Sequence, residues 1–174
     1  MANIENPPEE LLSKIAISLV PGIGSITAKS LIAYCGSAAQ VFREKEKILR
    51  TIPGIGTVLA KNILQSKVVS RAEEEVEFIL KNKVDAHFYL DESYPQRLRN
   101  CVDAPILLFS KGKPNLNFPK VISIVGTRNA TLYGRELTDK FILSLAERGY
   151  EIQIVSGLAY ASTSRHTVQH CGIT

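Results

Sequence analysis

The stretch that decides the fold of the carboxyl-terminal part is Val121-Ile122-Ser123-Ile124-Val125-Gly126-Thr127-Arg128, continued to Tyr133-Gly134. An apolar, β-branched run ends at a glycine, and apolar residues at helical spacing follow it. This order predicts a buried parallel strand, a tight turn and a crossover helix. Open α/β sheets bind ligands at the carboxyl ends of their strands. Helix N–H groups and the charge of Arg128 favour an anion there, so the turn is predicted to hold a phosphate-bearing partner.

Composition narrows the class of protein. With 174 residues, 45% of them hydrophobic, the chain can bury the core of one domain or of two small ones. A net charge of +4 permits nucleic acid as a partner without establishing it. The three cysteines form no C-x-x-C pair, so neither a disulfide framework nor a metal site is expected. No signal peptide or membrane span is recognisable, which favours a cytoplasmic protein.

An internal repeat occupies the amino-terminal part. Pro21-Gly22-Ile23-Gly24 returns as Pro53-Gly54-Ile55-Gly56 at an offset of 32 residues, and helix-like segments flank both copies. The pattern resembles a helix-hairpin-helix pair, in which backbone amides of the hairpins contact DNA phosphate without reading sequence. The alternative is a scaffold that only joins packed helices, as in sterile-alpha-motif-like (SAM-like) adaptor domains, and both readings stay open. The candidate contacts are Gly22, Gly24, Lys29, Gly54, Gly56 and Lys61.

The expected helices of this part are residues 11–19, 27–34, 41–49 and 58–69. A charged helix over 66–83, with Val76, Ile79 and Leu80 on its inner side, leads to short strands at 87–90 and 106–109. His87 has no partner at metal-ligand spacing, so a structural role is expected for it. Residues 67–118 therefore read as a connector with extension strands and no chemistry of their own.

Several consecutive motifs together resemble the DNA-processing protein A (DprA/Smf) family. They are Y-P-x-x-L from Tyr94, D-A-P from Asp103, I-V-G-T-R-x-x-T-x-Y-G from Ile124, and V-S-G-L-A-Y from Val155. The resemblance implies a Rossmann-like domain that binds single-stranded DNA without sequence preference. It also implies protection of incoming DNA in natural transformation, loading of RecA recombinase, a homodimer, no cofactor and no enzymatic activity.

By position, the resemblance assigns phosphate binding to Gly126, Thr127, Arg128, Ser156 and Gly157. Glycine lets the DNA backbone approach, arginine pairs with phosphate, and hydroxyl groups donate hydrogen bonds. Thr131, Tyr133 and Gly134 match the same motif and are expected to start and pack the helix. No catalytic residue is assigned.

The predicted fold class is α/β: a helical helix-hairpin-helix domain over 1–66, the connector over 67–118, and the first part of a Rossmann-like parallel-sheet domain over 119–160, incomplete at the carboxyl end. Residues 161–174 depart from the family pattern, which continues as G-I-D-x-x-A-H. Codons can be written for this family continuation such that deletion of their first G shifts the reading frame. Translation in the shifted frame then gives residues 161–174 of this chain, residue for residue. A frameshift near Ala161 is therefore expected, leaving an impaired fragment for which dimerisation is open.

Two alternatives remain at this point. A nucleotide-binding Rossmann enzyme, similar to lysine-decarboxylase-like phosphoribohydrolases, also places G-T-R after a strand. Against it, the chain has no G-x-G-x-x-G fingerprint, and Glu136, Asp139 and Glu147 lie on one expected helix, where a solvated face is the simpler reading. The other alternative is a protein-interaction domain over 10–66.

Overall fold

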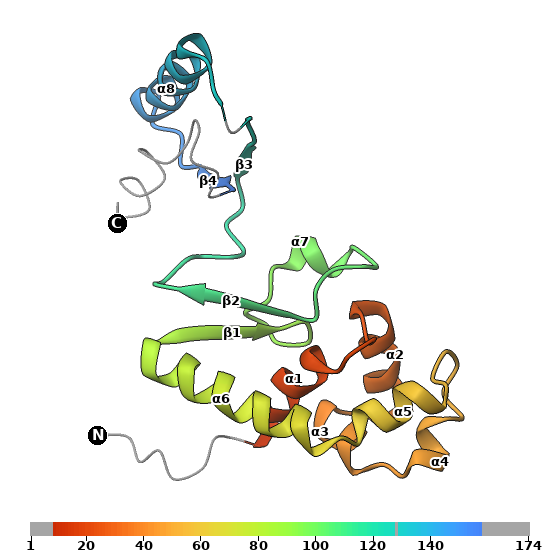
Figure 1. The fold of residues 1–174 in the computed structure, drawn as a ribbon. Helices are drawn as coiled ribbons and strands as arrows, with labels where there is room; N and C mark the ends of the chain where they lie inside the picture. The colour runs from red at the N-terminus through yellow and green to blue at the C-terminus, as the bar shows by residue number, and fades with distance from the viewer. Residues whose placement is uncertain (1–8, 128, 158–174) are drawn as a thin grey trace. The chain divides into compact units, whose positions relative to one another are not determined.

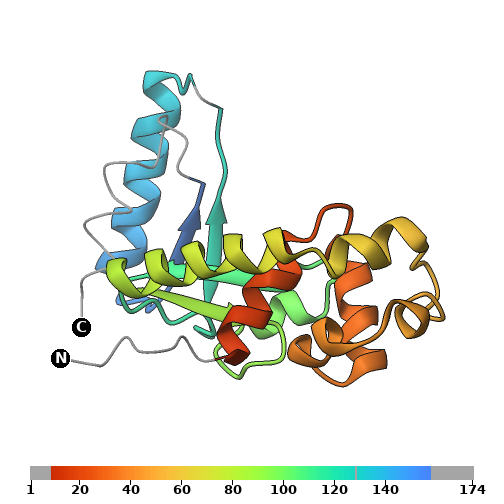
Figure 2. The ribbon, with the colours of Figure 1, turned by 60° about the horizontal axis from the view of Figure 1, so that its bottom comes forward.

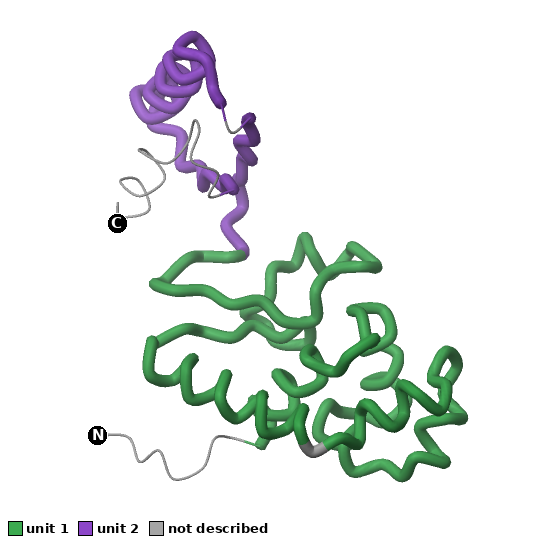
Figure 3. Tube along the Cα trace, viewed as in Figure 1, with its two compact units in different colours: residues 1–116 green, residues 117–174 purple. Residues whose placement is uncertain are grey.

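The computed structural model describes residues 9–127 and 129–157, and it divides the chain into two compact units, 1–116 and 117–174 (Figure 3). The segment predicted to be a connector, 67–118, falls almost entirely in the first unit. The tail 161–174, where the frameshift is expected, lies outside the described residues. Helices and two small sheets together make a mixed fold, consistent with the α/β class.

The described elements follow one another along the chain as Figure 1 labels them. Unit 1 contains α1 (Glu9–Leu19), α2 (Ser25–Cys35), α3 (Ala38–Arg43), α4 (Glu46–Leu49), α5 (Thr57–Ile63), α6 (Ser66–Asn82), β1 (Val84–Phe88), α7 (Gln96–Arg99) and β2 (Leu107–Lys111). Unit 2 contains β3 (Val121–Ile124), α8 (Leu132–Glu147) and β4 (Gln153–Ser156). None of the helices in the described part of the chain combines the length and hydropathy needed to cross a bilayer.

Two of the predicted helices are each broken in two. The segment 41–49 contains the end of α3 and the whole of α4, because Glu44 between them has extended backbone with ψ 150°. The segment 58–69 is likewise divided between α5 and α6 by Gln65, with ψ 125°. Both predictions were wrong because the apolar spacing continues across a bend when the helices on its two sides face the same core. Val41 of α3 and Leu49 of α4, for example, are both completely buried.

The core of unit 1 forms where α6 packs against α1, as Figure 2 shows. Ile15 and Ile17 of α1 and Val76 and Ile79 of α6 are at most 4% exposed. The prediction for the inner side of α6 fails at Leu80, which is 45% exposed. The helix reaches its carboxyl end beside that residue, and the chain leaves through a left-handed Lys83 at φ 52°.

Strands β1 and β2 pair antiparallel, with Phe88 opposite Leu107 at the buried end. The predicted strand 87–90 is therefore misplaced, since the strand begins at Val84 and ends at Phe88. His87 has the structural role expected of it, because Nδ1 contacts the Ser93 hydroxyl at 2.9 Å and Nε2 contacts the Ser110 hydroxyl at 2.8 Å.

Tyr94 ties two of the sequence motifs together. Its side chain is completely buried, and its hydroxyl donates a 2.6 Å hydrogen bond to the carbonyl oxygen of Pro105. Burial raises the pKa of the Tyr94 phenol. The Y-P and D-A-P motifs thus form one structural anchor, because the carbonyl group of Pro105 satisfies the buried hydroxyl.

Unit 2 is a strand–helix–strand unit. Strands β3 and β4 are parallel neighbours, with Val121 opposite Gln153 and Ile124 opposite Ser156, and α8 connects them. Of the large apolar side chains described in this unit, Ile142 is buried at 5% exposure, whereas Leu137, Phe141 and Val155 are each about half exposed.

Candidate nucleic-acid interface

The parallel register brings two of the predicted phosphate-binding segments to one edge of the sheet. Ile124 is the last residue of β3 and lies opposite Ser156, the last residue of β4. Gly126 and Thr127 follow the first strand, and Gly157 follows the second. Both segments therefore leave the carboxyl edge side by side, where α/β sheets bind their ligands.

The side chains at this edge are accessible. Gly126, Thr127 and Gly157 are exposed and Ser156 is partly buried, with its hydroxyl donating to the carbonyl oxygen of Gly157 at 3.3 Å. Arg128 lies outside the described residues. Phosphate binding by this set of five remains a prediction.

The start of α8 is capped by Thr131. The threonine oxygen Oγ1 accepts a 3.1 Å hydrogen bond from the backbone N–H of Gly134, which confirms Thr131 as a helix-start residue. A longer loop than the predicted tight turn separates the strand from the helix, since β3 ends at Ile124 and α8 begins at Leu132. The cap already uses the Gly134 N–H, so that amide is not available to an anion. Tyr133, expected to pack, is 72% exposed.

The two hairpin turns have nearly the same backbone conformation. Gly22 and Gly54 adopt φ 82° and φ 84°, a left-handed region that favours glycine. The next residue closes each turn: Ile23 N–H donates to Val20 at 3.1 Å, and Ile55 N–H donates to Ile52 at 3.0 Å. The repeat in the sequence is thus a repeat in the backbone.

The following glycines, Gly24 and Gly56, are the N-caps of α2 and α5, with extended backbone and no side-chain cap. In both copies the first amides of the second helix therefore lack a side-chain acceptor. Such amides can donate to an anion, which keeps DNA contact by the hairpins open.

The surroundings of the two turns differ. A Cβ atom added to Gly22 would lie 2.9 Å from Leu59 Cδ2, whereas one added to Gly54 would meet open space. Asn62 of α5 also donates to the carbonyl oxygen of Pro21 at 3.0 Å. The first turn is therefore held against α5, whereas the space beside Gly54 in the second turn is open.

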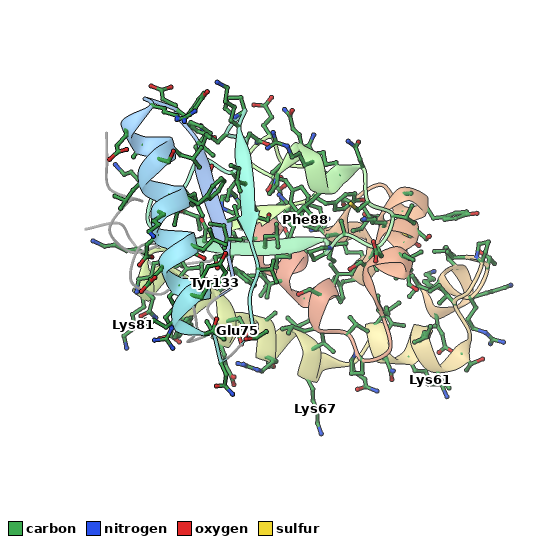
Figure 4. All side chains as sticks on the ribbon, turned by 90° about the horizontal axis from the view of Figure 1, so that it is seen from above. Lys61, Lys67, Glu75, Lys81, Phe88 and Tyr133 are labelled. Atoms are coloured by element: carbon green, nitrogen blue, oxygen red, sulfur yellow. The ribbon has the colours of Figure 1, made fainter. Side chains whose placement is uncertain are left out.

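The two candidate lysines differ in the same way. Lys29 Nζ donates to the Val102 carbonyl oxygen at 3.0 Å and lies 5.9 Å from the centroid of the Tyr89 ring. Lys61, at the equivalent position of the second copy, is exposed and points away from the fold (Figure 4). The two lysines have equivalent positions in the repeat. Their different surroundings could not be predicted from it, because the carbonyl partners of Lys29 lie about 70 residues away along the chain.

The same packing collects residues that sequence analysis missed. Tyr89 and Arg99 lie with Lys29 around a hollow of unit 1. No local motif could have found this group, since its members come from α2, the turn after β1 and the end of α7. Among residues 9–127 and 129–157, no three His, Cys, Asp or Glu side chains gather as a metal site.

Comparison with known proteins supports the resemblance. Residues 85–163 match the family model described as DNA recombination-mediator protein A. The protein named DNA processing protein DprA in Streptococcus pneumoniae is 45% identical over 71 residues, which is 40% of this chain and 24% of that protein. The protein of the same name in Bacillus subtilis is 39% identical over 69 residues, covering 39% of this chain and 23% of that protein.

A putative DNA processing protein DprA of Mycobacterium tuberculosis is 38% identical over 66 residues, covering 37% of this chain and 16% of that protein. The chain thus aligns with a quarter or less of the length of these relatives. The matched family region begins inside β1 and extends through β4, so it includes the carboxyl edge described above.

Proposed function

We propose that this chain, whose residues 85–163 match the model of the DNA recombination-mediator protein A family, is a member of that family and a non-enzymatic DNA-processing protein that binds single-stranded DNA without sequence preference. The names of its relatives support DNA processing as the role. The parallel register of Ile124 with Ser156 is the observation that carries the proposal, because it brings the two predicted phosphate-binding segments to one sheet edge.

In the proposed complex, glycine and hydroxyl groups line the path of the DNA backbone. Gly126 and Gly157 have no Cβ atom, so a phosphate can approach their backbone closely. Thr127 and Ser156 supply hydroxyl donors, and Arg128 supplies the charge that pairs with phosphate. These contacts go to the backbone of the strand and carry no base readout, which is why we expect indifference to sequence.

The hairpins form the second part of the proposal. We expect the first amides of α2 and α5, which follow the N-caps Gly24 and Gly56, to donate to phosphates, with Lys61 adding charge beside the second turn. Residues 20–65 contain six Lys or Arg, two Glu and no Asp, a local net charge of +4 that is as large as that of the whole chain. A local positive field of this kind favours a polyanion.

The remaining parts of the proposal follow from the family. They are a cytoplasmic role in natural transformation, protection of incoming DNA, loading of RecA recombinase onto it, and assembly as a homodimer. A RecA filament-assembly assay on single-stranded DNA, with and without this chain, tests the loading step directly. If the chain acts this way, filaments form sooner in its presence.

Binding itself is tested with labelled oligonucleotides of mixed sequence at several salt concentrations. We expect Arg128→Ala to weaken binding about tenfold, as loss of a charge-assisted contact does. The slope of log K against log salt should fall by about 0.7, the value for one phosphate contact on a single strand. Arg148→Ala is the matched control, since Arg148 is exposed at the other end of α8.

If Arg128→Ala and Arg148→Ala weaken oligonucleotide binding equally, the assignment of phosphate binding to the carboxyl edge is wrong. Hydrolysis of a nucleoside monophosphate by the purified chain would instead support the phosphoribohydrolase alternative and overturn the non-enzymatic reading.

A further inference from the structure

Unit 1 contains a hollow of about 280 Å³ between α2 and the segment that follows β1. Two cationic side chains line the hollow together with two aromatic and two aliphatic ones. They are Lys29, Arg99, Tyr89, Tyr94, Leu90 and Ala104. The proposed function does not use this hollow: the sheet edge of β3 and β4 belongs to the other unit, and the hairpin contacts are assigned to backbone amides and Lys61.

The two cations of this hollow contact backbone carbonyl groups. Lys29 donates to the Val102 carbonyl oxygen at 3.0 Å, and the Arg99 guanidinium donates to the carbonyl oxygen of Asp91. Those acceptors are neutral, and no carboxylate of the described residues lies within 4.0 Å of either cation. The nearby carboxylate of Asp91 pairs instead with Lys14 at 2.9 Å. Two positive groups are thus held in place by backbone contacts while their charges stay uncompensated.

The rest of the lining is apolar. Tyr94 and Ala104 are buried at 0% and 4% exposure, and the Tyr94 hydroxyl is engaged by Pro105, so the floor offers a ring and a methyl group. Leu90 stands at the rim with 60% of its surface exposed. Tyr89 is partly buried and packs edge-on against Phe88 at a centroid distance of 4.9 Å. A ligand that fills this space needs a flat apolar part beside an anionic one.

We propose that this hollow binds one nucleotide unit of a single strand, with its phosphate on Lys29 and Arg99 and its base against Leu90 and Tyr89. A nucleotide combines an anion with a planar apolar base, and stacking beside cations is how sequence-tolerant proteins bind single strands. An acidic peptide shares the charge, but it offers a planar apolar group only where an aromatic residue lies beside the carboxylate, whereas every nucleotide joins the two.

The place of the hollow in the fold also favours nucleic acid. Lys29 belongs to α2, the helix that begins directly after the first hairpin turn. A strand that contacts the amides of that turn needs little further length to reach the hollow. The inference rests on the proposed binding of single-stranded DNA and adds a nucleotide site to unit 1, beside the hairpin contacts proposed above.

The test uses the full chain, an oligothymidylate carrying 5-iodouracil for photocrosslinking, and peptide mapping. We expect a crosslink in the peptide that contains Tyr89 and Leu90. The variant Lys29→Gln/Arg99→Gln keeps an N–H donor at both positions and removes both charges. We expect it to bind about tenfold more weakly and to lose that crosslink, whereas Lys29→Arg/Arg99→Lys keeps both.

A charge-matched control is Lys67→Gln/Lys81→Gln, because both lysines are exposed on α6 and point outward (Figure 4). Its affinity should change less than that of the Lys29/Arg99 pair, and its crosslink should remain. If the chain binds the oligonucleotide but crosslinks only around residues 126–157, the hollow is overturned and the proposed function survives. If it binds no single strand, both fail.

Discussion

The two units of this chain differ in how far their apolar side chains are buried. In unit 1, Ile17, Leu31 and Leu49 are completely buried. In unit 2, Val125 is 89% exposed and Leu132 is 74% exposed, although both flank the predicted phosphate-binding loop. The first unit closes a core by packing helices against one another, including α6 against α1, which is distant in sequence. In its described residues, the second unit presents two parallel strands and one helix, and a parallel sheet needs cover on both faces.

This difference separates stability from function. Most of the burial lies in unit 1, so substitutions there should govern unfolding. The carboxyl edge of β3 and β4 lies in unit 2, so substitutions there should govern binding more than stability. Three pairs of substitutions test the contrast, each with one member in each unit.

The largest effect is expected from Leu31→Ala, set against Leu137→Ala. Leu31 is completely buried, and its truncation should lower the free energy of unfolding by about 3 kcal/mol through lost burial and a cavity. Leu137 is 54% exposed, and its truncation should cost less than about 0.5 kcal/mol. Urea unfolding followed by far-ultraviolet circular dichroism measures both. Equal losses would mean that unit 2 has a core comparable to that of unit 1.

A smaller effect is expected from Tyr94→Phe, set against Tyr150→Phe. Removing the Tyr94 hydroxyl leaves the Pro105 carbonyl without its donor and should cost about 1–2 kcal/mol. Tyr150 is 52% exposed, and its substitution should leave the unfolding midpoint nearly unchanged.

The Tyr94 pair also predicts a pH dependence. Because the pKa of Tyr94 is raised in the folded chain, its contribution is fully present below the unfolded pKa near 10. It is lost as the pH rises through the folded pKa, since the unfolded state releases the proton first. Unfolding midpoints measured from pH 8 to 11 should fall for the wild type and fall less for Tyr94→Phe. Parallel curves would contradict this assignment.

The smallest effects are expected from the two helix caps. Ser37 accepts a 3.1 Å hydrogen bond from Gln40 N–H at the start of α3, as Thr131 does from Gly134 N–H at the start of α8. Ser37→Ala and Thr131→Ala should each cost about 1 kcal/mol, because a cap is a local interaction. Thermal unfolding of both variants checks this. A much larger loss for one of them would show that its cap also supports tertiary packing.

Sequence reasoning was most successful where the signal is local. The strand Val121–Ile124 and the helix that follows it were predicted from a run of neighbouring residues, and the role of Thr131 at the helix start was predicted from the family motif. It failed at the breaks after Arg43 and Ile63, where two short helices share one apolar side. It also placed Leu80 inside, because periodicity alone does not say where a neighbouring element stops covering a helix.

The carboxyl edge of β3 and β4 combines a feature that a local motif predicts with one that depends on strand pairing. The motif around Gly126 predicted a turn at the end of a strand, and the family resemblance placed Ser156 and Gly157 in the same phosphate-binding set. The pairing of β3 with β4 brings the two segments to one edge, and local preferences alone do not specify that pairing.

The stretch from Val121 to Gly134 therefore determined by itself the local order of strand, loop and capped helix, because those preferences act over a few residues. The repeated P-G-I-G turns likewise determined their left-handed glycines, since other residues rarely adopt that conformation. Tertiary structure alone decided that Lys29 and Lys61, equivalent in sequence, have different surroundings. It also brought Tyr89 and Arg99 to Lys29, because packing joins segments that local preferences cannot relate.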